Sequence, residues 1–192
     1  MSSAFETVPN SQIVDFAAVH PLAWIVPVGD PSAATLMPLL LETDAQGMPV
    51  SLLGHLPKST LAASVLTEQP EIVCLFLGPN AYISPDWVSK PDWAPTWNFV
   101  SLKISGQLVL DEALTDEAIR SLVAHMNGLT GANWDIAAMG ERYTSLLKGI
   151  TGFRIRISSV LPRFKVGQDE NSVTYSEIYD ALTGHALQDW MR

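Results

Sequence analysis

The chain has 192 residues, of which 47% are apolar and 16% charged, and its formal net charge is −9. Disordered chains show the opposite balance, so this composition excludes disorder and indicates one folded domain. A negative net charge repels nucleic-acid phosphates, which argues against direct DNA binding by the surface as a whole. The low charged fraction also suggests that some apolar surface is covered by a second subunit.

The composition also bears on membranes, disulfides and metals. The longest apolar runs, such as 72–77, fall far short of the roughly 18 residues of a membrane span, and the N-terminus lacks a secretory signal pattern. A single cysteine, Cys74, excludes an internal disulfide and a multi-cysteine metal site. No two histidines have local metal-ligand spacing, so we predict no metal site. Because the chain lacks a signal pattern and paired cysteines, we expect a cytoplasmic protein.

The first half of the chain alternates short apolar runs with turn residues. These patterns predict a helix from Asn10 or Ser11 to just before Pro21, strands at Leu22–Val28, Ala34–Leu41 and Val50–His55, and a helix to about Glu68 with Ser59 as N-cap. The first two strands read as a hairpin around the turn at 29–31.

The second half begins with the most apolar strand and ends in helical patterns. We expect strands at Glu71–Gly78, Thr96–Asp111 and Gly152–Ser159, an ordered loop at Pro79–Pro95, a loop or edge at Pro162–Asn171, and helices at Ala118–Met126, Ala137–Leu147 and Tyr175–Leu187. Gly106 is expected to mark a bulge or bend in its strand. About six strands with few helices predict a mainly β, α+β fold, a small antiparallel barrel with peripheral helices.

Three clusters are candidates for function, and each has an ordinary structural alternative. His55 precedes Pro57-Lys-Ser-Thr60, where a lysine, two hydroxyls and a helix start suit an anion; on these residues alone, a capped helix with a surface lysine is favoured. The aromatic and proline-rich segments 78–87 and 95–99 form either a rigid cover or a wall beside a planar ligand, with Ser84 and Asn98 as hydrogen-bonding groups.

The third cluster is basic. Arg154, Arg156, Arg163 and Lys165 fall within twelve positions and form either a solvated strand face or a phosphate or nucleic-acid contact. Trp97 and Trp134 are expected to be packing residues, and Cys74 a buried, inert thiol.

Several of these motifs together resemble one family. The strongest is Gly78-Pro-Asn-Ala-Tyr-Ile-Ser-Pro-Asp-Trp87 followed by Pro95-Thr-Trp-Asn-Phe-Val100. Further matches are Phe5-Glu-Thr7, His20-Pro-Leu22, Pro38-Leu-Leu-Leu41, Gly54-His-Leu56, Gly149-Ile-Thr-Gly-Phe153 and Phe164-Lys-Val-Gly-Gln168. The chain resembles the PaiB-like FMN-binding negative transcriptional regulators, whose fold is the FMN-binding split β-barrel shared with pyridoxamine phosphate oxidases.

The resemblance implies a homodimer with FMN in clefts between subunits. It implies a phosphate cradle at Lys58, Ser59 and Thr60, next to His55. It further implies that the isoalloxazine lies near Leu36, Met37 and Pro38. The remaining implied contacts are Ser84, Trp97, Asn98, Lys165 and Gln168.

The chain departs from the family pattern at the same places. Pro57-Lys-Ser-Thr60 replaces the family's ARAN, so a guanidinium is exchanged for an ammonium without its bidentate fork. Leu36 and Met37 stand where the family has a histidine before the proline. Phe164-Lys-Val-Gly-Gln-Asp169 replaces WKLSQN and adds a negative charge. These departures argue against tight retention of FMN.

The sequence therefore predicts a single split-barrel domain over residues 1–192, with a helical insertion at about 112–148 and a C-terminal tail at about 172–192. The leading function is an FMN-binding protein that resembles PaiB-type regulators. The alternatives are an FMN-dependent oxidoreductase, such as a flavin reductase or a pyridoxamine-oxidase-like enzyme, and a diverged dimer without cofactor. No acid or base is identified as catalytic. DNA is a partner by resemblance only, and no membrane partner is expected.

Overall fold

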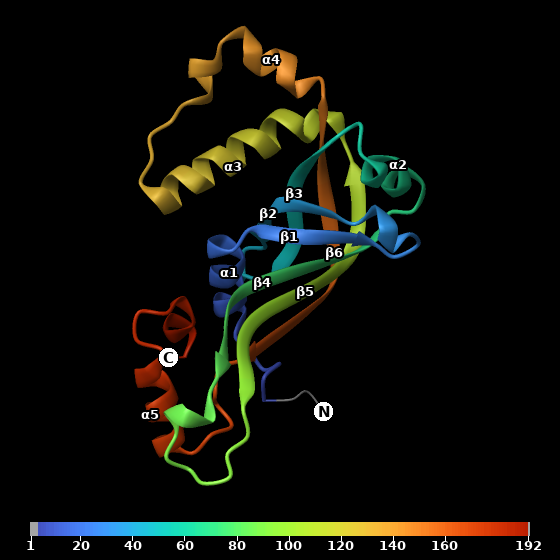
Figure 1. Ribbon diagram of the computed structural model, residues 1–192. Coiled ribbons are helices and arrows are strands. Elements are labelled where there is room, and N and C mark those ends of the chain that lie inside the picture. Colours follow the sequence, from blue (N-terminus) through green and yellow to red (C-terminus); the bar gives the residue numbers. More distant parts are fainter. Residues whose placement is uncertain (1–3, 192) are drawn as a thin grey trace. The chain divides into compact units, whose positions relative to one another are not determined.

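The computed structural model describes residues 4–191 and contains a closed antiparallel barrel of six strands in the order β1-β2-β3-β6-β5-β4 (Figure 1). The strands are β1 (Leu22–Pro27), β2 (Thr35–Thr43), β3 (Pro49–Pro57), β4 (Glu71–Ile83), β5 (Thr96–Leu110) and β6 (Ile150–Lys165). The helices are α1 (Asn10–Val19), α2 (Leu61–Glu68), α3 (Thr115–Thr130), α4 (Glu141–Leu147) and α5 (Ser172–Ala181). Short 3₁₀ turns are η1 (Pro31–Ala33), η2 (Pro85–Trp87), η3 (Glu112–Leu114), η4 (Ile136–Met139) and η5 (Ala186–Trp190).

The chain forms two compact units. The barrel unit comprises residues 10–76 and 103–160, and the terminal unit comprises 4–9, 77–102 and 161–191. Strands β4, β5 and β6 each contribute residues to both units. The barrel and the α+β class predicted from the sequence are confirmed.

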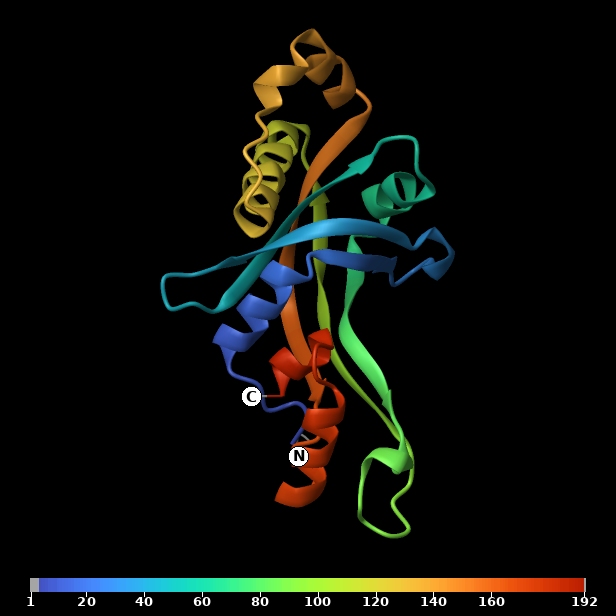
Figure 2. The ribbon, with the colours of Figure 1, turned by 60° about the vertical axis from the view of Figure 1, so that its left-hand side comes forward.

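The barrel interior is filled by alternate residues of the strands. Ile25, Leu39, Leu52, Ile104 and Phe153 are all fully buried. Because successive side chains of a strand point to opposite faces, the residues between them face outward. Helices α1 and α3 pack on β2, and α3 also packs on β3, so part of this outer face is covered (Figures 1 and 2).

Several predicted boundaries are wrong. Strand β4 continues through Pro79 to Ile83, where a loop was expected, and β6 continues through Pro162 to Lys165. Pairing of β4 with β1 ends at Phe76, and pairing of β6 with β3 ends at Arg156. Both prolines therefore lie where the strand has lost that neighbour, and proline is tolerated at such edges.

Another wrong boundary is that of the terminal helix. Helix α5 begins at Ser172 because the Asn171 carboxamide accepts hydrogen bonds from the amides of Val173 and Thr174, at 3.0 and 3.1 Å. It ends before Gly184, which has a φ of 81°, and the chain continues as η5. The N-cap of α2 is Thr60 and not Ser59.

Gly106 serves close approach within a continuous strand. A Cβ atom at this position would lie 2.3 Å from the carbonyl oxygen of Arg156 on β6. The missing side chain therefore lets β5 and β6 approach inside the barrel wall.

Candidate functional site

The corner between β3 and α2 carries the predicted phosphate cradle. Lys58 and Ser59 are exposed there, and the backbone amide of Lys58 donates to the carbonyl of Gly149 at 3.0 Å. The hydroxyl of Thr60 accepts from the amide of Ala63 at 3.3 Å and donates to the carbonyl of Pro57 at 2.9 Å. Thr60 therefore fixes the start of α2, and its hydroxyl is engaged within the turn.

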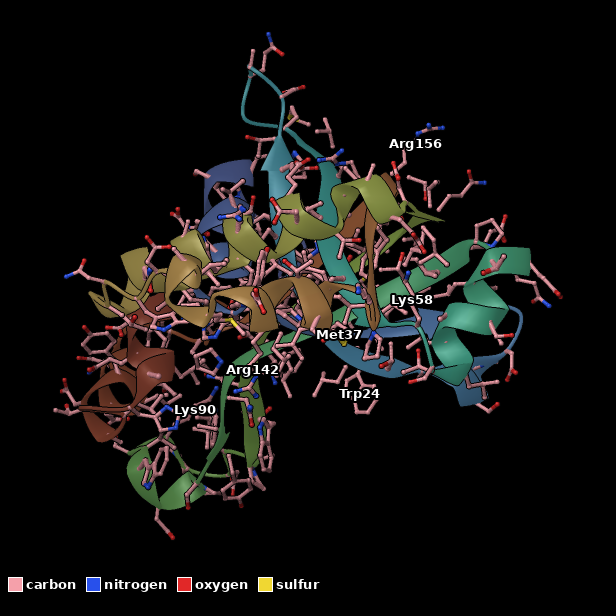
Figure 3. All side chains as sticks on the ribbon, turned by 90° about the horizontal axis from the view of Figure 1, so that it is seen from above. Trp24, Met37, Lys58, Lys90, Arg142 and Arg156 are labelled. Atoms are coloured by element: carbon pink, nitrogen blue, oxygen red, sulfur yellow. The ribbon has the colours of Figure 1, made fainter. Side chains whose placement is uncertain are left out.

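Lys58 forms an ion pair with Glu112 of η3. Both side chains line an open pocket of about 350 Å³ that also exposes Ser64, Thr67 and Thr151. Figure 3 shows Lys58 beside α2. The corner thus combines a cation, hydroxyl groups and the first turn of a helix, and Glu112 was not anticipated from the sequence.

His55 lies on β3 opposite Gly152 of β6 and does not line the Lys58 pocket. Burial lowers the pKa of His55, so the imidazole is neutral at pH 7. Its Nδ1 atom is buried and has no hydrogen-bond partner among residues 4–191. An unpaired buried ring nitrogen is costly, which makes this atom a candidate for ligand contact.

Leu36, Met37 and Pro38 lie on β2, next to β1. Leu36 is opposite Trp24, which in turn is opposite Leu75 of β4. These three side chains are 43%, 49% and 44% exposed and form an apolar row across three strands, called the Trp24 row below. Figure 3 shows Trp24 pointing away from the barrel. In the sequence, this surface is indicated by the apolar residues at the outward-facing positions of β1, such as Trp24.

In the terminal unit, Lys165 and Asn98 line a pocket of about 260 Å³ together with Trp93, Thr96 and Glu170. The Lys165 ammonium donates to the Thr96 hydroxyl, and Asn98 is 2% exposed. The Trp93 indole donates to a Glu170 carboxylate oxygen at 2.9 Å. The predicted cluster around Lys165 is thus a polar pocket, whose Trp93–Glu170 contact the sequence did not indicate.

Gln168 and Ser84 are engaged in their own turns. The Gln168 carboxamide donates to the Phe164 carbonyl at 2.5 Å and accepts from the Val166 amide at 2.8 Å. The Ser84 hydroxyl accepts from the amide of Asp86 at 3.2 Å and caps η2. Both side chains have local structural roles.

Trp97 and Trp134 were expected to be packing residues, but they lie outside the core, with 52% and 48% of their surface exposed. The Trp97 indole donates to the Asn80 side-chain oxygen at 3.1 Å and meets the ring of Tyr82 edge-on at 6.0 Å. Trp97 alternates with buried Asn98 along β5, so it occupies the outward face.

Two of the four residues in the predicted basic cluster are held in ion pairs. Arg154 pairs with Glu42 at 2.8 Å and with Glu117 at 3.0 Å, and Arg163 pairs with Glu6 at 3.1 Å. Burial opposes ionisation of Glu42, but hydrogen bonds from Arg154 and Ser51 outweigh it and lower its pKa.

Arg156 is exposed and forms no ion pair in the described part of the chain. Figure 3 shows its side chain extending away from the ribbon. One unpaired guanidinium attracts a DNA duplex only weakly, because the net charge of −9 on the chain repels the phosphates.

Comparison with known proteins identifies the family. A family model described as "Putative FMN-binding domain" matches residues 1–159. The chain belongs to this FMN-binding family. The FMN-binding and PaiB-like predictions are therefore confirmed at the level of the family.

A curated relative is "Protease synthase and sporulation protein PAI 2" of Bacillus subtilis (strain 168), which is 29% identical over 115 residues. The match covers 58% of this chain and 55% of that protein, so the chain spans about half the length of this relative.

Solved structures share the fold. The FAD and heme binding protein from Mycobacterium smegmatis has a TM-score of 0.60 at 10% identity, over 92% of this chain and 80% of that one. The flavocytochrome Anf3 from Azotobacter vinelandii has a TM-score of 0.58 at 16% identity, over 90% and 73%. These likenesses confirm the split-barrel fold.

Two observations concern membranes and metals. Among the described residues, no helix has the length and apolar character needed to cross a bilayer. Within residues 4–191, no cluster of three or more His, Cys, Asp or Glu side chains is placed to hold a metal ion.

Proposed function

We propose that this protein binds FMN through its phosphate at the corner between β3 and α2. Lys58 supplies the positive charge, and exposed Ser59 supplies a hydroxyl. The first turn of α2 adds backbone N–H groups that have no acceptor within the helix. Thr60 holds this corner in place through its two local hydrogen bonds.

The residues present fit a polar, planar ligand. The buried, unpartnered Nδ1 of His55 lies on β3, which ends at Pro57 immediately before Lys58, and the exposed Trp24 row offers apolar surface near Met37 and Pro38. We therefore retain Leu36, Met37, Pro38 and His55 as flavin contacts. The contacts proposed for Ser84, Trp97, Asn98, Lys165 and Gln168 stay predictions, and the local bonds of Ser84 and Gln168 weaken their case.

Bound FMN would supply redox chemistry, while the chain would bind and orient it and exclude water. We assign no catalytic acid or base.

The protein acts as a homodimer that uses the Trp24 row as its interface. Trp24, Leu36 and Leu75 are cross-strand neighbours, so they form one continuous patch, and none carries a charge. Apolar patches of this kind on a soluble fold mark interaction surfaces, and a second copy offers the same apolar chemistry. In light scattering, Trp24→Glu should lower the mass to one chain at concentrations where the parent and Val109→Glu, a control at another exposed strand position, remain dimers.

If the protein regulates transcription, it does so without strong direct contact with DNA. Its net charge is −9, and two of the four residues in the basic cluster are held in ion pairs. We expect weak, salt-sensitive DNA binding and a cytoplasmic location. Nanomolar, sequence-specific binding at physiological salt, measured by fluorescence anisotropy, would refute this part of the proposal.

The phosphate site is tested with Lys58→Ala and with Lys148→Ala, an exposed lysine at the end of α4, as the matched control. A charged hydrogen bond contributes about 1.5–3 kcal/mol. Because the Lys58 side chain is 38% exposed, we expect the lower end, or about tenfold weaker FMN binding. Riboflavin, which lacks the phosphate, should bind equally to all three proteins. Unchanged FMN affinity in Lys58→Ala, measured by flavin fluorescence, would place the phosphate elsewhere.

A further inference from the structure

We propose that Glu112 tunes the discrimination of this site between FMN and riboflavin by competing with the phosphate for Lys58. The inference rests on the proposed phosphate site. Lys58 is the one cationic side chain among the described residues that line the pocket, and it already forms an ion pair with Glu112. The FMN phosphate and the Glu112 carboxylate would therefore compete for the same ammonium group.

The electrostatics of this arrangement disfavour the phosphate. The phosphate of FMN carries close to two negative charges at pH 7, since its second pKa is about 6. An ammonium group has three N–H donors, so Lys58 can contact both anions, but they then repel each other across a short distance. Each phosphate that binds must share Lys58 with Glu112 or displace its carboxylate into water.

The fold holds the backbone of Glu112 at this place. Asp111 donates its amide to the carbonyl of Gly152 at 2.9 Å, and its carboxylate accepts from the amide of Ala113 at the same distance. Glu112 is the first residue of this capped turn, and its side chain is 77% exposed. The carboxylate can therefore swing away while the backbone stays, and its replacement by an amide leaves the turn intact.

The size of the effect follows from this exposure. Exposed ion pairs are weak, so removal of the competing charge should have a modest effect. We expect Glu112→Gln to tighten FMN binding by roughly two- to fivefold. Riboflavin, without a phosphate, should gain less than about twofold by the same argument.

A matched control separates this local effect from net charge. Glu117 on α3 is also exposed and also paired, with Arg154, but it does not line the Lys58 pocket. Glu117→Gln removes the same charge from the chain, so its FMN affinity should stay close to that of the parent.

The experiment measures dissociation constants of FMN and riboflavin for the parent, Glu112→Gln, Glu117→Gln and Lys58→Ala. Tighter FMN binding confined to Glu112→Gln supports the inference. If Lys58→Ala weakens FMN but Glu112→Gln does not tighten it, the inference is overturned and the phosphate site stands. Equal gains for riboflavin, or equal gains in Glu117→Gln, also overturn it. If Lys58→Ala leaves FMN affinity unchanged, the phosphate site itself is wrong, and the inference falls with it.

Discussion

Gly152 is the point at which the start of α3 is fastened to β6. Its amide donates to the hydroxyl of Thr115 at 2.9 Å, and its carbonyl accepts from the amide of Asp111, also at 2.9 Å. A Cβ atom here would lie 2.6 Å from the carbonyl carbon of Leu114 and 2.6 Å from the nitrogen of Thr115. Gly152→Ala therefore drives the start of α3 away from β6.

These contacts determine how strongly Gly152→Ala destabilises the fold. Atoms that pack well lie about 3.5–4.0 Å apart, so the two backbones must separate by roughly 1 Å. Overpacking of this kind costs about 1–3 kcal/mol. Loss of the buried hydrogen bond to Thr115 adds about 1–3 kcal/mol, because the Gly152 amide is left without an acceptor. We expect a total destabilisation of roughly 2–6 kcal/mol.

The assay is urea denaturation followed by tryptophan fluorescence, with parent and variants at one protein concentration because association affects apparent stability. The control is Gly128→Ala within α3, where an added Cβ meets nothing within 4 Å. That variant should be about 0.5–1 kcal/mol more stable, since alanine favours a helix. A free energy of unfolding for Gly152→Ala within about 0.5 kcal/mol of the parent would refute the reasoning.

Three further outcomes follow from burial, charge and backbone conformation. Burial raises the pKa of the Cys74 thiol to about 12, so a thiol reagent at pH 8 should label it only as fast as the protein unfolds; rapid labelling of the native protein would contradict this. The pKa of Glu42 is lowered in the folded state, so the ionised carboxylate stabilises the fold above about pH 4.5. This contribution to stability is lost as the pH falls further through the folded pKa. Arg154→Met should remove that part of the acid sensitivity, seen as a flatter Tm between pH 5 and 3. Gly167 has a φ of 88°, so Gly167→Ala should destabilise by about 1 kcal/mol or more in urea denaturation, and an unchanged midpoint would argue against strain at this turn.

The barrel was predictable because its strands carry their signal locally. In β6, Phe153 and Ile155 alternate with Arg154 and Arg156, which indicates one buried face, and both apolar residues are fully buried. The strand ends were not predictable in the same way. Proline has no backbone N–H, so it disrupts a strand only where a neighbouring strand needs that donor. Whether Pro79 or Pro162 has such a neighbour depends on the strand registers, which are not visible in the sequence.

The candidate site was predictable to a similar degree. Lys58 could be singled out because a cation next to a helix start is a local pattern. Its partner Glu112 lies 54 positions away, and only the fold brings the two together. The exposure of Trp97 was missed for a related reason, because alternation shows that a strand has two faces but not which of them is covered.

The strand order of the barrel also has a consequence for synthesis of the protein. Strand β3 pairs on one side with β2, its neighbour in sequence, and on the other with β6, roughly 100 residues later. At about 5–20 residues per second, β3 waits about 5–20 s on the ribosome for that partner. During this interval its free edge and the side chains of Leu52 and Leu56, fully buried at the end, face solvent and other nascent chains. The rate of translation therefore sets how long this edge of β3 stays unpaired before the barrel can close.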